Sequence, residues 1–341
     1  MTELPPGHPP IPSRKVGLLL INLGTPEATD FFSVRAYLKE FLSDRRVIEI
    51  NPALWWLILN GIILNIRPKR SGHAYEKIWN REKNESPLKT FTRAQCEKLT
   101  ATLGQKDQLI VDWAMRYGKP SIAEKLRKLK DQGCERILLF PLYPQYAGAT
   151  TATALDKAYE TLQAMRWQPA IRTVPPYYDH PAYIDAIAGS LKQAMKAHEW
   201  KPDRVLIAFH GLPREYLDKG DPYHCHCQKT ARLVREKLKL GKDFVQLVFQ
   251  SRFGRAEWLK PYAQDTVEQL PSQGVKNLLM ISPGFSSDCV ETLEELGIGL
   301  KEIFLEKGGH NFAVVPCLND SSESIAMLGT LVRNELSGWL S

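Results

Sequence analysis

The sequence predicts an α/β protein made of two similar doubly wound, Rossmann-like units with parallel sheets and a cleft between them. Apolar runs alternate with amphipathic stretches along the chain, which is the pattern of a parallel sheet with helices on both faces. The chain also repeats short motifs in the same order in its two halves. The matched segments are 16–26 (VGLLLINLGTP) with 203–213 (DRVLIAFHGLP), 116–118 (RYG) with 252–254 (RFG), and the Gln-Gly pairs 132–133 and 273–274, each ahead of an apolar run.

This repeat divides the chain into sections. Residues 1–14 are rich in proline and are expected to form a disordered tail outside the fold. The first unit is expected at 15–170 and the second at 171–321. The amphipathic segment 322–341 is expected to form a helix that packs back on the first unit and completes it.

Within the first unit, the segment 52–66 (PALWWLILNGIILNI) is strongly apolar and contains Trp55 and Trp56. It is interrupted by an Asn-Gly pair and is shorter than the roughly 20 residues needed to span a bilayer. Two interpretations remain: an ordinary buried helix, or an exposed apolar lip that touches a membrane surface or admits an apolar ligand. The basic cluster at 67–70 beside the tryptophans favours the exposed lip.

The composition is that of a globular protein: 43% of the 341 residues are hydrophobic, 24% are charged, and the net charge is +7. The basic residues are scattered and lack the aromatic interleaving of an RNA-binding sheet, so we expect no nucleic-acid partner. The six cysteines lack the spacing of small secreted domains, which favours a cytoplasmic protein, peripheral to the inner face of the membrane where the lip contacts it. No GxGxxG fingerprint, Walker loop or GxSxG elbow supports a nucleotide-binding or α/β-hydrolase function.

The strongest candidate for chemistry is His210, which ends the apolar strand at 205–209 in the second unit. A second apolar strand at 278–281 leads towards Glu291. Because the carboxyl ends of neighbouring parallel strands meet at one edge of a sheet, we expect this imidazole and carboxylate to form a proton-handling or metal-handling pair. The alternative for His210 is a core histidine whose nitrogens are satisfied by the backbone.

Further carboxylates follow Glu291. Glu291 and Glu295 lie four residues apart and so share one face of the expected helix, which Asp288 could cap. Acidic residues at a helix start often only complement the helix dipole. A row of carboxylates leading away from a histidine is also a route for a cation, and we expect Asp288 and Glu295 to support the pair in this way.

The run His224-Cys225-His226-Cys227 is a weaker metal-site candidate. An extended backbone would point the histidines to one side and the cysteines to the other, so the four could not close on one ion. The spacing also fits no standard zinc motif. The turn just before it, at 220–223 (GDPY), is expected to close over the cleft.

These motifs together resemble the ferrochelatase family, whose members insert ferrous iron into protoporphyrin to make haem. The resemblance rests on 210–213 (HGLP), 220–223 (GDPY) and 287–295 (SDCVETLEE), and it runs in family order through 22–26 (NLGTP), 86–88 (SPL), 116–117 (RY), 143–146 (YPQY) and 250–254 (QSRFG). It implies a chelatase-like fold and a lyase that acts as a metal chelatase on protoporphyrin IX and ferrous iron. The expected assembly is a monomer without a tightly bound cofactor, since Fe²⁺ is a substrate. No cysteine follows Cys317, so no iron–sulfur cluster is expected.

The resemblance also implies roles for single residues. His210 and Glu291 match the catalytic and metal-site residues of the family, with Asp288 and Glu295 as the acidic row behind them. The residues expected to bind the porphyrin are Arg116, facing the propionates, with Tyr117, Ser86, Trp258, Phe285, Ile21, Leu23, Trp55 and Trp56. The sequence departs from some relatives at three positions. Leu23 stands where those relatives have Met or Tyr, Cys289 where they have His, and Ala208 where they have a small hydroxyl residue. Two questions stay open. The first is whether His210 accepts a proton or ligates iron. The second is whether the chain is instead a carrier of tetrapyrroles or metals, or a chelatase for coproporphyrin or another metal.

Overall fold

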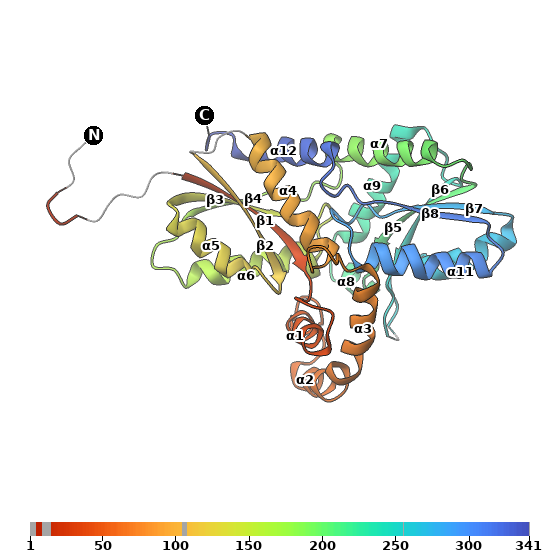
Figure 1. The fold of residues 1–341 in the computed structure, drawn as a ribbon, viewed down its shortest axis with the longest axis horizontal. Helices are drawn as coiled ribbons and strands as arrows, with labels where there is room; N and C mark the ends of the chain where they lie inside the picture. Colours follow the sequence, from red (N-terminus) through yellow and green to blue (C-terminus); the bar gives the residue numbers. More distant parts are fainter. Residues whose placement is uncertain (1–4, 9–14, 104–107, 255, 341) are drawn as a thin grey trace.

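Two four-stranded parallel sheets form the frame of the molecule (Figure 1). The computed structural model describes residues 5–8, 15–103, 108–254 and 256–340, so most of the expected tail at 1–14 lies outside the described residues. The strand order is β2-β1-β3-β4 in one sheet and β6-β5-β7-β8 in the other, so each sheet orders its strands in the same way. This confirms the predicted pair of similar doubly wound units. The strands are β1 (Lys15–Gly24), β2 (Leu109–Tyr117), β3 (Cys134–Pro141), β4 (Ala170–Thr173), β5 (Arg204–His210), β6 (Val245–Gln250), β7 (Asn277–Ile281) and β8 (Asn311–Val315).

Helices cover both faces of each sheet, which is why the central strands β1 and β5 are apolar along nearly their whole length. In Figure 1 the upper face carries α4 (Pro87–Leu103), α7 (Pro181–Ala197) and α12 (Ser322–Leu336), and α9 (Tyr223–Leu238) packs against α7. The lower face carries α5 (Ile122–Asp131), α6 (Thr153–Gln163) and α11 (Lys301–Glu306). Helix α10 (Ala263–Gln269) contacts α11 and β6. The remaining short elements are η2 (Gly148–Ala152), α8 (Arg214–Asp218), η3 (Leu270–Gln273) and the π-helix η4 (Glu291–Leu300).

The largest hydrophobic cluster runs through both units without interruption. It joins Leu20 and Phe140 of the first sheet to Ile207 and Phe209 of the second. Helix α12 belongs to the same cluster and contacts both α4 and α7, so the predicted C-terminal helix lies across both units rather than on the first alone. The first sheet ends with β4 at Thr173, slightly beyond the boundary expected at residue 170.

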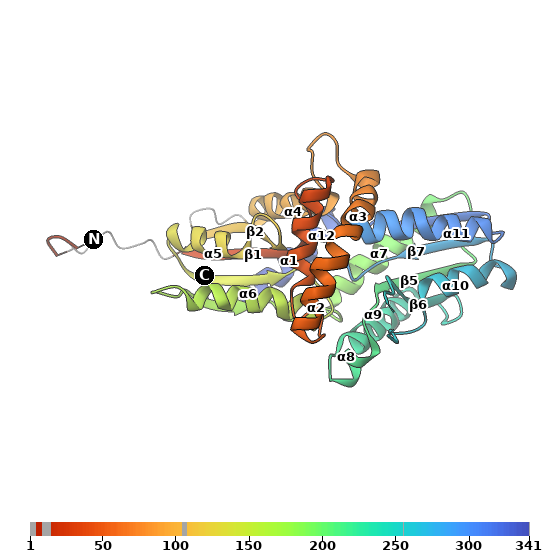
Figure 2. The ribbon, with the colours of Figure 1, turned by 90° about the horizontal axis from the view of Figure 1, so that it is seen from below.

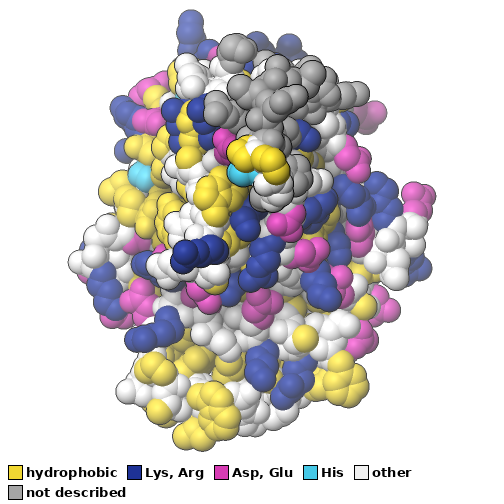
Figure 3. Space-filling view, turned by 90° about the vertical axis from the view of Figure 1, so that its left-hand side faces the viewer, with side chains coloured by type: hydrophobic (Ala, Val, Ile, Leu, Met, Phe, Trp, Pro, Cys, Tyr) yellow, Lys and Arg dark blue, Asp and Glu magenta, His cyan; other side chains and the backbone are white. Residues whose placement is uncertain are grey.

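The apolar segment projects from the body between the two sheets, where α1 (Phe31–Leu42), α2 (Pro52–Ile58), the π-helix η1 (Leu59–Ile63) and α3 (Leu64–Ile78) lie together (Figure 2). Many of its large side chains are exposed, although Leu59 and Leu64 are buried against α1, and Figure 3 shows hydrophobic side chains beside Lys and Arg at this lower end of the molecule. We call this surface the lip; it comprises Leu54, Trp56, Leu57, Ile62 and Ile66. Within the part of the chain that the structure describes, no helix combines the length and the apolar character needed to cross a membrane.

Candidate functional site

His210 lies at the carboxyl end of β5, in register with Gln250 at the end of β6. The side chain is half-buried, and Nδ1 lies 2.7 Å from the Gly211 carbonyl oxygen. An Nδ1–H that donates to this carbonyl leaves Nε2 with a free lone pair, able to take a proton or a metal ion. The backbone here requires glycine, because a Cβ at Gly211 would lie 2.7 Å from the Gln250 carbonyl oxygen and 3.0 Å from the Trp258 ring.

Residues 250 and 251 join this strand end to the carboxylates of η4. The Gln250 side-chain amide donates to the Glu291 carbonyl oxygen (3.2 Å). Ser251 holds the Glu295 carboxylate through both of its donors, with N at 2.8 Å from Oε1 and Oγ at 2.5 Å from Oε2. Ser251 has a φ of 64°, a left-handed conformation that is uncommon for residues other than glycine. Strained backbone of this kind is found preferentially at functional sites.

His210 and the two glutamates share one electrostatic environment. Burial raises the pKa of Glu295, the hydrogen bond from Ser251 and the nearby His210 lower it, and Glu291 raises it further. His210 and Glu291 are therefore each near enough to Glu295 to affect its ionisation, while the direct pairing of His210 with Glu291 stays a prediction. Among the residues that the structure describes, however, no three His, Cys, Asp or Glu side chains converge closely enough to hold a metal ion, these three included.

Side chains of α1 and α3 interact electrostatically with this grouping. Burial raises the pKa of the Tyr37 and Tyr75 phenols, and the charge of Glu291 raises both further. Arg67 on α3 is half-buried; burial lowers its pKa, while Glu291 and the two tyrosines act in the opposite direction. A salt bridge of 2.9 Å between Lys77 Nζ and Glu294 Oε1 fastens α3 to η4. Sequence reasoning treated Arg67 only as part of a basic cluster and did not single out either tyrosine.

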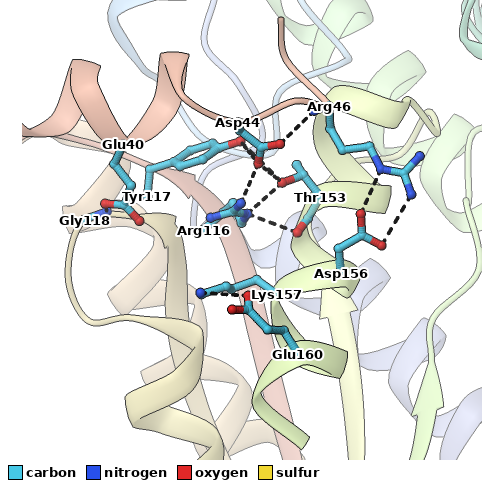
Figure 4. A network of polar contacts seen from close by, with 10 residues as sticks. All are labelled: Glu40, Asp44, Arg46, Arg116, Tyr117, Gly118, Thr153, Asp156, Lys157 and Glu160. Carbon is cyan, nitrogen blue, oxygen red and sulfur yellow. Dashed lines mark hydrogen bonds and ion pairs between the residues drawn. The ribbon is translucent and has the colours of Figure 1, made fainter. Parts of the chain in front are cut away.

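Arg116 and Tyr117, at the end of β2, are engaged by a buried carboxylate that the sequence did not reveal (Figure 4). Asp44 Oδ2 lies 2.5 Å from Arg116 Nη2, accepts the Tyr117 hydroxyl at 2.9 Å and also accepts the Thr153 hydroxyl. Burial opposes ionisation of Asp44, but the hydrogen bonds from Thr153, Arg46 and Tyr117 and the charge of Arg116 hold its pKa below the ordinary value. The guanidinium predicted to face porphyrin propionates is thus paired with Asp44 and is only 12% exposed.

Asp288 is buried at the start of η4 and uses both oxygens within the protein. Oδ1 accepts the Thr292 hydroxyl (2.9 Å) and the Cys317 backbone N–H (3.3 Å), and Oδ2 accepts the Asn319 amide (2.6 Å). Cavities of about 340 and 250 Å³ flank the carboxylate and share Asp288 and Leu293 as lining residues. Asp288 therefore ties the start of η4 to residues 317–319; it does not cap the helix, because the N-cap position is Val290, which has no side-chain cap hydrogen bond.

The other predicted porphyrin contacts differ in how far they are accessible. Trp56 is 63% exposed, while Trp55, Trp258, Phe285 and Leu23 are half-buried. Trp258 lies against Gly211, beside His210, and its buried Nε1 finds no acceptor among the described residues. Three of the predicted contacts have almost no accessible surface in this structure: Tyr117; Ile21, within the core of the first unit; and Ser86, whose Oγ accepts the Lys89 backbone N–H.

The run 224–227 forms the first turn of α9, not an extended segment. His226 stacks on Tyr178 with ring centroids 3.7 Å apart, and its Nδ1 accepts the Tyr146 backbone N–H at 3.2 Å. The preceding turn makes a similar contact, because Asp221 accepts the backbone N–H of Gly148 at 2.7 Å. In these contacts the segment fastens the second unit to the loop after β3.

Known proteins similar to this chain belong to the family that its sequence motifs resemble. The family model "Ferrochelatase" matches residues 15–336. A ferrochelatase of Agrobacterium fabrum is 55% identical over 340 residues (100% of this chain and 99% of that protein), and one of Rhizobium meliloti is 57% identical over 333 residues (98% of each). Among solved structures, SirB from Bacillus subtilis with Fe³⁺ has the same fold, with a TM-score of 0.58 and 12% identity over 96% of this chain and 98% of that one. The chain belongs to the ferrochelatase family.

Proposed function

We propose that this protein inserts ferrous iron into protoporphyrin IX, forming protohaem and releasing two protons, the terminal step of haem biosynthesis. Family membership over nearly the whole chain supports the reaction. The structural observation that carries the proposal is the grouping of His210 with Glu291 and Glu295 at adjoining strand and helix ends. Ferrous iron is here a substrate, and the proposed enzyme needs no tightly bound cofactor and no iron–sulfur cluster.

The reaction requires a base and a weakly held metal ion. A free-base porphyrin is planar and carries two inner N–H protons, which must leave as the four nitrogens close on the metal. In our proposal His210 Nε2 accepts the first proton, because a neutral imidazole is a competent base near neutral pH. Glu291 presents iron to the ring, with Glu295 behind it, since carboxylates and imidazole both suit Fe²⁺. The absence of three converging ligands among the described residues supports transient holding of an ion that must be handed on.

The porphyrin is proposed to lie between the lip and the carboxylates. Trp258, Phe285, Leu23, Trp55 and Trp56 offer apolar surface to a flat macrocycle. Binding contacts remote from the reacting nitrogens can hold the ring bent, so that the lone pairs point out of its plane towards the metal. Arg67 makes no hydrogen bond or ion pair within the described residues, so its donors remain available for a porphyrin carboxylate.

We also propose that the lip makes peripheral contact with a membrane from the cytoplasmic side and that the protein acts as a monomer. The exposed side chains Trp56, Leu57 and Ile66 stand beside basic residues, a combination that favours the surface of an anionic bilayer. Protoporphyrin is itself apolar, so a lip in contact with lipid can take the substrate directly.

Anaerobic assays with protoporphyrin and ferrous iron test the function. Haem formed in large molar excess over protein is the expected result, and haem that stops at one equivalent would indicate a carrier. His210→Ala should lose insertion activity while keeping porphyrin binding, measured by porphyrin fluorescence. Undiminished turnover in that variant would overturn the role of His210. The same assay with coproporphyrin should give a lower rate, because the apolar lip favours the more hydrophobic porphyrin.

A further inference from the structure

One contact connects the lip directly to the loop that follows β6. The Arg67 guanidinium lies over the ring of Phe253, with its central carbon 5.1 Å from the ring centroid. Phe253 is 54% exposed, which is unusual for a large aromatic side chain, and it contributes to no hydrophobic core cluster. The ring therefore does not serve packing of the core.

Two other observations connect this pair with the proposed metal site. Phe253 stands two residues after Ser251, which holds the Glu295 carboxylate through both of its donors. Arg67 is close enough to Glu291 for the two charges to influence one another. The ring and the guanidinium thus link α3 to the segment of the second unit that holds the Glu295 carboxylate.

The guanidinium has few other constraints. Within the described part of the chain, Arg67 makes no hydrogen bond and no ion pair, and the nearby cation Arg70 repels it. A flexible arginine loses rotamer entropy when a ligand fixes it. A flat aromatic face that already holds the guanidinium reduces this loss, because the donors on its rim are left pointing outward for an anion.

We propose that Phe253 is a positioning residue that holds Arg67 across the mouth of the cleft, ready to bind a carboxylate of the incoming porphyrin. The proposal rests on the proposed function, because the ligand is a dicarboxylic porphyrin. Phe253 acts through Arg67 and makes no essential contact with the macrocycle.

A double-mutant cycle tests this. Phe253→Ala should raise the Kd for protoporphyrin about two- to fivefold, the range that a single cation–π contact supports. Arg67→Ala should raise it about tenfold, as expected for a charge-assisted hydrogen bond. In the Arg67→Ala background, Phe253→Ala should have no further effect. Additive effects of the two changes would overturn the proposal and indicate direct contact between the ring and the porphyrin.

Three comparisons sharpen the cycle. Phe253→Tyr keeps an aromatic face and should bind as the wild type does, whereas Phe253→Leu keeps apolar volume only and should behave as the alanine variant. Against protoporphyrin dimethyl ester, which lacks free carboxylates, Phe253→Ala should change nothing; an equal loss with the ester would contradict the proposal. Tyr159→Ala, which removes another exposed aromatic side chain, is the matched control. A wild type that makes no haem would refute the proposed function, whereas haem synthesis with an additive cycle would refute only this inference.

Discussion

Replacing Asp44 by asparagine removes the charge that balances Arg116 while keeping the size of the side chain. Both side chains of the pair are largely buried, with 9% and 12% of their surface exposed. Removing one partner of a buried ion pair costs about 3–5 kcal/mol, because the other charge stays out of water without compensation. Arg116 keeps two hydrogen bonds from its Nε to Thr153, so we expect the lower end, about 3 kcal/mol, or roughly a 150-fold change in the unfolding equilibrium.

Urea unfolding followed by circular dichroism measures this change. The matched control is Asp156→Asn in the same network, since Asp156 and its partner Arg46 are each about half exposed and an exposed pair contributes little. A cost for Asp44→Asn no larger than that of the control would refute the buried pair. The pKa of Asp44 is lowered, so its contribution is complete above the unfolded-state value of about 3.9 and is lost as the pH falls through the folded-state pKa.

The double variant Asp44→Asn/Arg116→Gln separates the two roles considered for Arg116. If the arginine is chiefly a structural partner, removing both charges should recover much of the stability lost in Asp44→Asn. If Arg116 leaves Asp44 to bind a porphyrin propionate, as the sequence predicts, Arg116→Gln should weaken binding of the dicarboxylic porphyrin and Asp44→Asn should strengthen it.

Three further predictions concern the site and its support. Glu291→Gln should raise the KM for ferrous iron about tenfold, as expected for loss of one charged ligand contact. Anaerobic initial-rate assays measure this, with Glu294→Gln as the control. An unchanged KM for iron would contradict the role of Glu291. Gly211→Ala should lower both activity and stability, by about 1–3 kcal/mol, because the new Cβ would lie 2.7 Å from the Gln250 carbonyl oxygen; wild-type activity and urea midpoint would contradict this. Burial lowers the pKa of His226 in the folded protein. As the pH falls, the imidazole is therefore protonated in the unfolded chain before it is protonated in the folded protein. The free energy of unfolding then decreases as the pH drops from about 6.5, the pKa in the unfolded chain, towards the pKa in the folded protein. His226→Gln should therefore lose less stability between pH 7.5 and 5.5, and a slope equal to that of the wild type would contradict it.

The repeated architecture was predictable because its signals are local. Each unit opens with an apolar strand that ends in a Gly-x-Pro motif, and β1 and β5 lie at equivalent places in the two sheets. The π-helical form of η4 had no such signal, since the sequence of 291–300 fits an ordinary helix equally well. What fixes its start lies elsewhere, in the hydrogen bonds of Asp288 to Cys317 and Asn319.

The sequence could predict the position of a site residue only where that position depends on the end of a strand alone. His210 follows a buried strand, and the topology of parallel sheets then places it at a ligand-binding edge. Asp44 pairs with a residue 72 positions away and Ser251 with one 44 positions away, and no periodicity connects such positions. Ile21 shows the complementary limit: in a strand covered on both faces every side chain is apolar, so the sequence does not tell which ones face a cleft.

The lip is exposed because other helices already cover the faces of the sheets. Hydropathy measures how strongly a segment avoids water but not whether the fold offers it a place to be buried, so 52–66 fitted a buried helix as well as an exposed lip. In the structure α4, α7, α9 and α12 occupy one face of the sheets and α5, α6 and α11 the other (Figure 1). Among the described residues, helices thus cover both faces of the sheets, and no side chain of α2 is buried. Its apolar side chains stay exposed because the core is already complete without them, and they are therefore available for an apolar ligand or a lipid surface.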